Sequence, residues 1–145
     1  MSVNVNVDSA GVEAWLREGA TRNAEALRLF QDEGSQIVME EMRGQVPFRT
    51  GFLRESIGTA YSPDGFVVSP NAPYAPYVDQ GTAPHVIFPA RARALRFETG
   101  MGVPVFARRV KHPGSRGRFF IQRTSELVRD RLVAAFNDIL ERVHS

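Results

Sequence analysis

The strongest pattern in the sequence lies toward its two ends, where apolar residues recur at steps of three and four and so share one helix face. This spacing predicts a long helix over 21–44 and another over 120–143. Gly44 and Pro47 end the first helix, because glycine often follows a helix and proline cannot continue one. The apolar positions are Leu27, Phe30, Gly34, Ile37, Val38 and Met42 in the first, and Leu127, Val128, Leu132, Ala135, Phe136, Ile139, Leu140 and Val143 in the second.

Shorter elements flank these helices. Valines alternate with polar residues over 3–7, which predicts a half-buried strand. Asp8 and Ser9 supply oxygens that cap helix N-termini, so a short helix is expected to follow them and to break or bend at Gly19. The run from Thr124 to Glu126 would cap the last helix if that helix starts late.

The middle of the chain reads as strands and turns. Ser62-Pro63-Asp64-Gly65 predicts a hairpin turn, in which proline presets φ and Gly65 accepts a positive φ. Because strands come in a run between helices, we expect an α+β fold in one domain spanning 1–145, with a mostly antiparallel sheet packed on both long helices. The strands of this sheet are expected within residues 3–7, 55–69, 85–97 and 103–110.

Composition excludes several classes of protein. The chain has no cysteine, so disulfides and thiolate-bound metals are ruled out. Its N-terminus lacks the basic and apolar regions of a signal peptide, and no apolar run is long enough to span a membrane. We therefore expect a protein made in a cytoplasm that has no membrane partner.

Charge is divided unevenly along the chain. The segment 91–123 contains nine basic residues and one acid, Glu98, a net charge of +8, whereas the whole chain carries +2 and the remainder therefore −6. A basic segment beside an acidic remainder predicts electrostatic docking, including onto a second copy of the chain. The same region is rich in glycine and proline, so we expect a long mobile loop excursion within about 82–118.

No constellation indicates an enzyme. His85, His112 and His144 lack partners at metal-ligand spacing, and no Gly-x-Ser-x-Gly elbow is present. The basic run 112–118 lacks the Gly-Lys-Ser/Thr ending of a phosphate-binding loop. We expect no catalytic residue, cofactor or metal.

The basic stretch has two functional interpretations. Arg91, Arg93 and Arg96 lie near Phe88 and Phe97, and arginine beside aromatic residues is a common arrangement for binding single-stranded nucleic acid. The same mixture is enriched in protein interfaces. We favour a protein interface and keep nucleic-acid binding through 91–123 as the alternative.

Two segments have specific patterns without chemistry. The first runs over 47–57, where Gly51 helps to make a turn and Leu53 and Ile57 return to the core. The second runs over 74–82, where Gly81 supplies a tight turn after a small aromatic patch. By themselves these segments read as connectors between helix and strand.

In their order and spacing, these motifs resemble the phage tail-completion or head–tail joining (neck) protein family, typified by the tenth gene product of the lambda-like phage HK ninety-seven. The resemblance covers about residues 3–140, and departs from the family pattern at Pro76 and Gln80. The matching residues are Pro47, Thr50, Gly51, Leu53, Arg54, Ser56 and Ile57, then Tyr74, Ala75, Val78, Gly81 and Thr82, then Leu95, Phe97, Val110, His112, Pro113, Gly114, Phe119 and Phe120.

The resemblance implies a structural virion protein of a tailed double-stranded DNA phage. Such a subunit forms a ring, six-fold by this resemblance, between the tail terminator protein and the head connector or stopper. Genomic DNA passes through the ring without sequence-specific binding, and the particle is assembled in the host cytoplasm. A minor tail protein elsewhere in the tail is the nearest alternative.

From the charge pattern we add one expectation about sites in this ring. The residues expected to dock acidic surfaces of neighbouring subunits or of the tail terminator are Arg91, Arg93, Arg108, Arg109 and Arg118. We expect the isolated subunit to be monomeric or weakly associating.

Overall fold

The computed structural model describes residues 9–145 except Thr50, and their side chains except those at 9–13 and 16. The strand expected over 3–7 lies outside the described residues. The chain divides into two compact units.

The first, which we call the helical unit, comprises residues 1–72 and 120–145, and the second, the arm unit, comprises residues 73–119. Whether the two behave as the one domain expected from the sequence stays a prediction. No helix among the described residues combines the length and the apolar character that crossing a membrane requires.

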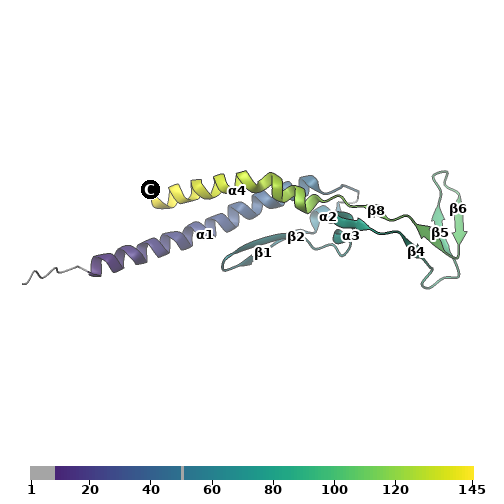
Figure 1. Ribbon diagram of the computed structural model, residues 1–145, viewed down its shortest axis with the longest axis horizontal. Helices are drawn as coiled ribbons and strands as arrows, with labels where there is room; N and C mark the ends of the chain where they lie inside the picture. The colour runs from purple at the N-terminus through teal and green to yellow at the C-terminus, as the bar shows by residue number, and fades with distance from the viewer. Residues whose placement is uncertain (1–8, 50) are drawn as a thin grey trace, which may run out of the picture. The chain divides into compact units, whose positions relative to one another are not determined.

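Two long helices form the body of the helical unit. Helix α1 spans Ser9–Gln45, α4 spans Phe120–His144, and the two lie side by side and antiparallel (Figure 1). Two surface ion pairs between the helices fit this antiparallel order, because the later residue of α4 pairs with the earlier residue of α1. Arg131 lies 3.3 Å from Glu41, and Arg142 lies 2.7 Å from Glu33. The buried side chains along the two helices are Ala26, Ser35, Met42, Phe120, Thr124, Val128 and Ile139. Both long helices predicted from the apolar spacing are therefore confirmed.

The break expected at Gly19 is wrong, because α1 continues through it without interruption. A glycine inside a helix costs only about 1 kcal/mol relative to alanine, too little to stop a helix that is stabilised elsewhere by packing. A Cβ placed on Gly19 would meet no atom within 4 Å, so no neighbour requires glycine there.

The last helix begins at Phe120, as the predicted span 120–143 requires, so Thr124 lies inside it and a late start with a cap at Thr124 is excluded. The Thr124 hydroxyl donates to the Phe120 carbonyl oxygen at 2.7 Å. The buried stripe is narrower than predicted, since Leu127 is 53% exposed and Phe136 38% exposed. α4 packs mainly against α1, and one partner helix covers a narrower face than a full core would.

A β-hairpin packs on α1. Strand β1, Ile57–Ser62, pairs antiparallel with β2, Gly65–Pro70, as the sequence predicted. Gly34 of α1 allows the close approach, because a Cβ there would lie 3.1 Å from the Phe66 ring. The hydroxyls of Ser35 and Tyr61 also lie 3.0 Å apart, which joins the buried helix face to the hairpin.

The turn chemistry of this hairpin differs from expectation. Ser62 pairs with Gly65, leaving a two-residue loop, but Gly65 does not adopt a positive φ. Positive φ occurs instead at Gly51, whose φ of 82° begins the short helix α2, Phe52–Glu55. As predicted for that motif, Leu53 and Ile57 are buried, at 5% and 3% exposed.

The arm unit is a short helix followed by a folded-back ribbon. Helix α3 spans Ala75–Gln80 with proline in its first turn, so Pro76, a departure from the family pattern, suits the helix start. Three antiparallel ladders follow one another along the ribbon (Figure 1). Along the sequence, the strands of each ladder lie between the two strands of the ladder before it. They pair β3, Gly81–Thr82, with β8, Ser115–Arg116; β4, His85–Ile87, with β7, Val110–His112; and β5, Leu95–Glu98, with β6, Pro104–Ala107.

The predicted α+β class is confirmed, with antiparallel strands throughout the described residues. The strands form four separate two-stranded ladders and not one sheet, and among these the β1–β2 hairpin contacts α1. The basic excursion within 82–118 is present as the paired ribbon. Its mobility stays a prediction.

Candidate interaction site

The base of the arm unit is a close crossing of two backbone segments, residues 79–83 and 114–117, which we call the glycine crossing. A Cβ on Gly81 would lie 2.3 Å from the Ser115 carbonyl oxygen, and one on Gly114 would lie 2.3 Å from the Thr82 carbonyl oxygen. Both glycines also have positive φ, 80° and 85°, a conformation that glycine adopts without strain. Glycine is therefore required on each side of the crossing.

Polar contacts complete the crossing. The hydroxyls of Thr82 and Ser115 lie 3.0 Å apart. The Gly114 N–H donates to Nδ1 of His112 at 3.1 Å, which makes that nitrogen an acceptor and places the ring proton on Nε2. Residues from the second family motif and from the His-Pro-Gly segment, about 30 positions later in the sequence, thus meet at one place.

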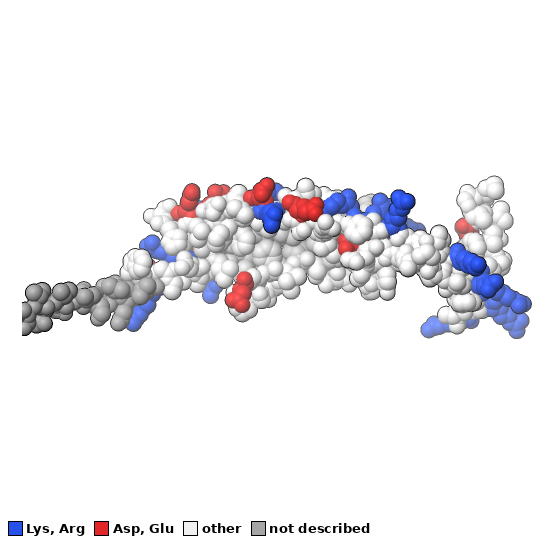
Figure 2. Space-filling model, in the orientation of Figure 1, with Lys and Arg blue, Asp and Glu red and all other residues white. Residues whose placement is uncertain are grey.

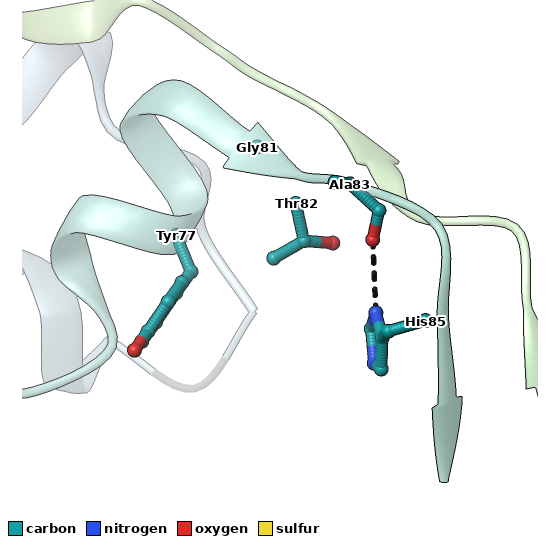
Figure 3. Close-up of a pocket in the computed structure, with 5 residues that line it drawn as sticks. All are labelled: Tyr77, Gly81, Thr82, Ala83 and His85. Carbon is teal, nitrogen blue, oxygen red and sulfur yellow. Dashed lines mark hydrogen bonds between the residues drawn. The ribbon is translucent and has the colours of Figure 1, made fainter.

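A pair of histidines lies beside the crossing. His85 and His112 are cross-strand partners, and their ring centroids are 4.9 Å apart. Nδ1 of His85 lies 2.9 Å from the Ala83 carbonyl oxygen, so in this contact His85 is the donor (Figure 3). The two rings therefore have complementary roles at Nδ1, which donates in His85 and accepts in His112.

An open depression lies on one side of this crossing, with a volume of about 560 Å³. Figure 3 shows its lining residues, Tyr77, Gly81, Thr82, Ala83 and His85. His85 is the one titratable side chain in this set besides the phenol of Tyr77. Within the described residues no group of three His, Cys, Asp or Glu side chains stands close enough to hold a metal ion. The depression offers shape and a few polar atoms but no catalytic arrangement.

The end of the arm unit is held to α3. The backbone N–H of Arg118 donates to the Val78 carbonyl at 3.0 Å, and that of Phe119 donates to the Asp79 carbonyl at 2.8 Å. Phe119 has a φ of 50°, an uncommon conformation for a residue other than glycine. A Cβ on Gly117 would lie 2.6 Å from the Asp79 carbonyl oxygen, so this third glycine also belongs to the crossing. This role of Gly117 was not predicted from the sequence.

Beyond the crossing, the ribbon changes register once. From β3–β8 to β4–β7 two residues intervene on each side, so the pairing continues unshifted across Pro84 and Pro113. From β4–β7 to β5–β6 the outgoing side has seven residues, 88–94, against two on the return side, 108–109. These five extra residues form a bulged segment opposite a two-residue link.

Four of the predicted arginines converge at this register change. Arg91 and Arg93 lie in the longer segment, and Arg108 and Arg109 are the link opposite. All four are exposed, and the described part of the chain supplies no ion-pair partner to them. Figure 2 shows Lys and Arg gathered over this part of the arm unit. Arg118, the fifth, is also exposed but lies at the glycine crossing.

The arm unit as a whole is strongly basic. It holds eight basic and two acidic residues, a net charge of +6, and the helical unit holds ten basic and fourteen acidic residues, a net charge of −4. The ion pair between Arg96 and Glu98, 3.8 Å, joins two exposed side chains and is weak. The charge division predicted along the sequence therefore nearly coincides with the division into units.

The arm unit also exposes large apolar side chains, among them Phe88 and Phe97, which the sequence indicated as interface residues beside the arginines. The large apolar side chains of the ribbon that are more than a third exposed are Val86, Ile87, Phe88, Phe97, Met101, Val103 and Phe106. No residue from 81 to 119 is buried. A two-stranded ribbon has no opposite layer to cover its faces, so alternation of apolar residues does not by itself produce a core.

The remaining motif residues belong to other parts of the chain. Pro47, Gly51 and Leu53 belong to the helical unit, and Thr50 lies outside the described residues. Tyr74 immediately precedes α3 and is 40% exposed. Comparison with protein-family models, with curated proteins and with solved structures finds no match for this chain.

Proposed function

We propose that this chain is a structural ring subunit of a tailed double-stranded DNA phage. It acts as a tail-completion or neck protein that joins the head connector to the tail. The proposal starts from the resemblance carried by the two motifs and the His-Pro-Gly segment. It assigns no catalysis to the chain.

The observation that carries the proposal is the exposed basic and apolar surface of the ribbon, held at its base by motif residues. Gly81 and Gly114 allow the two backbone segments to cross, and the ribbon extends from that crossing. Exposed arginines together with exposed phenylalanines are typical of one side of a protein interface. A structural subunit that joins neighbours needs such a surface, whereas an enzyme does not.

In this function the subunit forms a ring, six-fold by the resemblance, in the virion neck. A ring requires a heterologous interface, in which one patch meets a different patch on the neighbour. The ribbon, with Arg91, Arg93, Arg108 and Arg109, is the proposed docking element toward neighbouring subunits or the tail terminator. DNA passes through the centre without sequence-specific binding, and the head connector or stopper lies on the other side.

Reversal of two charges tests the docking role. Arg108→Glu with Arg109→Glu should yield tails and filled heads that fail to join stably, since the altered ribbon repels acidic surfaces. Arg28→Glu with Arg49→Glu is the matched control, because it makes the same charge change at exposed positions of the helical unit. Normal infectious particles from the first variant would rule out docking through the ribbon.

The place of the subunit along the tail needs a direct measurement. Gold-labelled antibody against the chain should mark the head-proximal end of isolated tails in electron micrographs. Label along the tail tube would favour a minor tail protein, and unlabelled tails and particles would contradict the proposal altogether.

The exposed aromatics keep nucleic-acid binding as the second candidate. Phe88, Phe97 and Phe106 are 65%, 42% and 66% exposed near the arginines, which suits base stacking beside a positive backbone track. Under that function, binding to DNA would weaken steeply with salt, and the Arg108→Glu, Arg109→Glu variant would join normally but eject DNA abnormally.

A further inference from the structure

The ribbon needs a partner that offers both negative charge and apolar surface. Its outer part, residues 85–112, carries six basic residues and one acid, Glu98, a net charge of +5. Its phenylalanines are largely exposed, including Phe88 at 65% and Phe106 at 66%. A partner that covered the arginines alone would leave these rings in water.

The helical unit carries a surface with the complementary chemistry. A depression of about 600 Å³ is lined by Glu33, Asp138, Glu141, Arg142 and Ser145. Arg142 is already paired with Glu33 at 2.7 Å. Among the described residues, no basic side chain forms an ion pair with Asp138 or Glu141. Figure 2 shows acidic atoms over this part of α4.

The helix that supplies those two carboxylates also exposes apolar side chains. Leu127 is 53% exposed and Val133 58% exposed on α4, more than a helix covered on its apolar face would leave. α4 thus provides both acidic and apolar groups on one element. Acidic and apolar groups are the two kinds of surface that the arginines and phenylalanines of the ribbon require.

We propose that the ribbon of one copy binds the α1–α4 face of a second copy, with Arg108 and Arg109 of the first meeting Asp138 and Glu141 of the second. The inference rests on the proposed function and deepens it, because it names the subunit's own neighbour as the partner. A net charge of +6 on one unit and −4 on the other favours a second copy over an unrelated protein. Different patches meet, so the contact repeats head to tail and can close a ring.

The division of labour within this contact follows from solvent screening. Exposed ion pairs are individually weak and are weakened further by salt, so the charges set the register and select the partner. The phenylalanines lose water on docking and supply most of the affinity. Association should therefore weaken, but persist in part, at high salt.

A charge-swap experiment tests the pairing. The ribbon-reversed variant carries Arg108→Glu and Arg109→Glu, so its glutamates would meet the unchanged Asp138 and Glu141 of a second copy. The face-reversed variant carries Asp138→Arg and Glu141→Arg, so its new arginines would meet the unchanged Arg108 and Arg109. Each variant alone should self-associate about tenfold or more weakly than the parent chain by sedimentation velocity at low salt. Mixed in equal amounts they should associate again, because the reversed ribbon attracts the reversed face and the unchanged ribbon attracts the unchanged face. Failure of the mixture to associate would overturn the proposal.

Cysteine trapping tests the same contact when association is weak. The chain has no cysteine, so Arg109→Cys in one copy and Asp138→Cys in a tagged second copy introduce the only thiols. The mixed disulfide dimer should form at low salt much faster than with Arg109→Cys and Glu126→Cys, a control at another acid of the same helix. Equal rates for the two pairs would contradict the proposed contact.

These outcomes separate the inference from the proposed function. If gold label marks the tail end but neither trapping nor charge-swap rescue occurs, the ribbon docks a different virion protein and the inference fails alone. If the unmodified chain instead binds single-stranded DNA with a steep salt dependence and is not trapped, the ribbon binds nucleic acid and the inference is overturned.

Discussion

The helical unit and the arm unit use apolar residues in opposite ways. In the helical unit Phe120 and Ile139 are fully buried between helices, and even the polar Ser35 is covered. In the ribbon no residue from 81 to 119 is buried, although the sequence there is just as rich in Phe and Val. The difference teaches that burial, and with it stability, is concentrated in the helical unit, whereas the ribbon leaves its apolar side chains open to the docking that we propose.

Hydrogen exchange on the free protein would give the largest contrast. Amides of α4 near Val128 and Ile139 should exchange on the order of a thousandfold more slowly than those of β5 and β6, because helix opening requires unfolding of the core. Strong protection of the amides through 98–118 would contradict the predicted mobility of the excursion and the contrast between a stable helical unit and a mobile ribbon.

Substitution in the core should cost far more than substitution in the ribbon. Ile139→Ala should lower the free energy of unfolding by about 2–5 kcal/mol, since it removes a fully buried side chain. Phe106→Ala, at a side chain 66% exposed, should change it by about 0.5 kcal/mol or less. Denaturant unfolding followed by circular dichroism measures both, and similar losses would show that the ribbon contributes to a shared core.

The glycine crossing should be the most sensitive point of the arm unit. Gly81→Ala places a Cβ 2.3 Å from a backbone oxygen at a φ of 80°, and should favour local opening by about 1–3 kcal/mol. Gly102→Ala is the control, because its φ is 73° but nothing lies within 4 Å. Amide chemical shifts should change across 79–83 and 114–117 in the first variant and only near the ribbon tip in the second. Equal, local changes would mean that the crossing is not rigid.

Charge reversal in the ribbon should have the smallest effect on stability. Arg108→Glu with Arg109→Glu should leave the free energy of unfolding within about 0.5 kcal/mol of the parent chain, because both side chains are exposed and without an ion pair in the described structure. A loss above about 2 kcal/mol in denaturant unfolding would show that these arginines support the fold, and docking results with this variant would need reinterpretation.

Part of the candidate site follows from local sequence. The tight turn at Gly81 was predicted from its place after an aromatic patch, and the arginines were singled out by their density alone. Both features depend on neighbouring residues only. The His-Pro-Gly segment was likewise noticed, but no local signal indicated that Gly114 would pack against Thr82.

By itself, the sequence determined the two long helices, the β1–β2 hairpin and the uneven charge, because periodicity, turn residues and composition act over short distances. Tertiary structure decided the rest. The register of the ribbon, and with it the placement of Arg108 and Arg109 opposite the segment that holds Arg91 and Arg93, depends on how many residues lie between paired strands on each side. Continuation of α1 through Gly19 and the exposure of Phe106 depend on which surfaces find a partner layer, and a one-dimensional pattern does not contain that information.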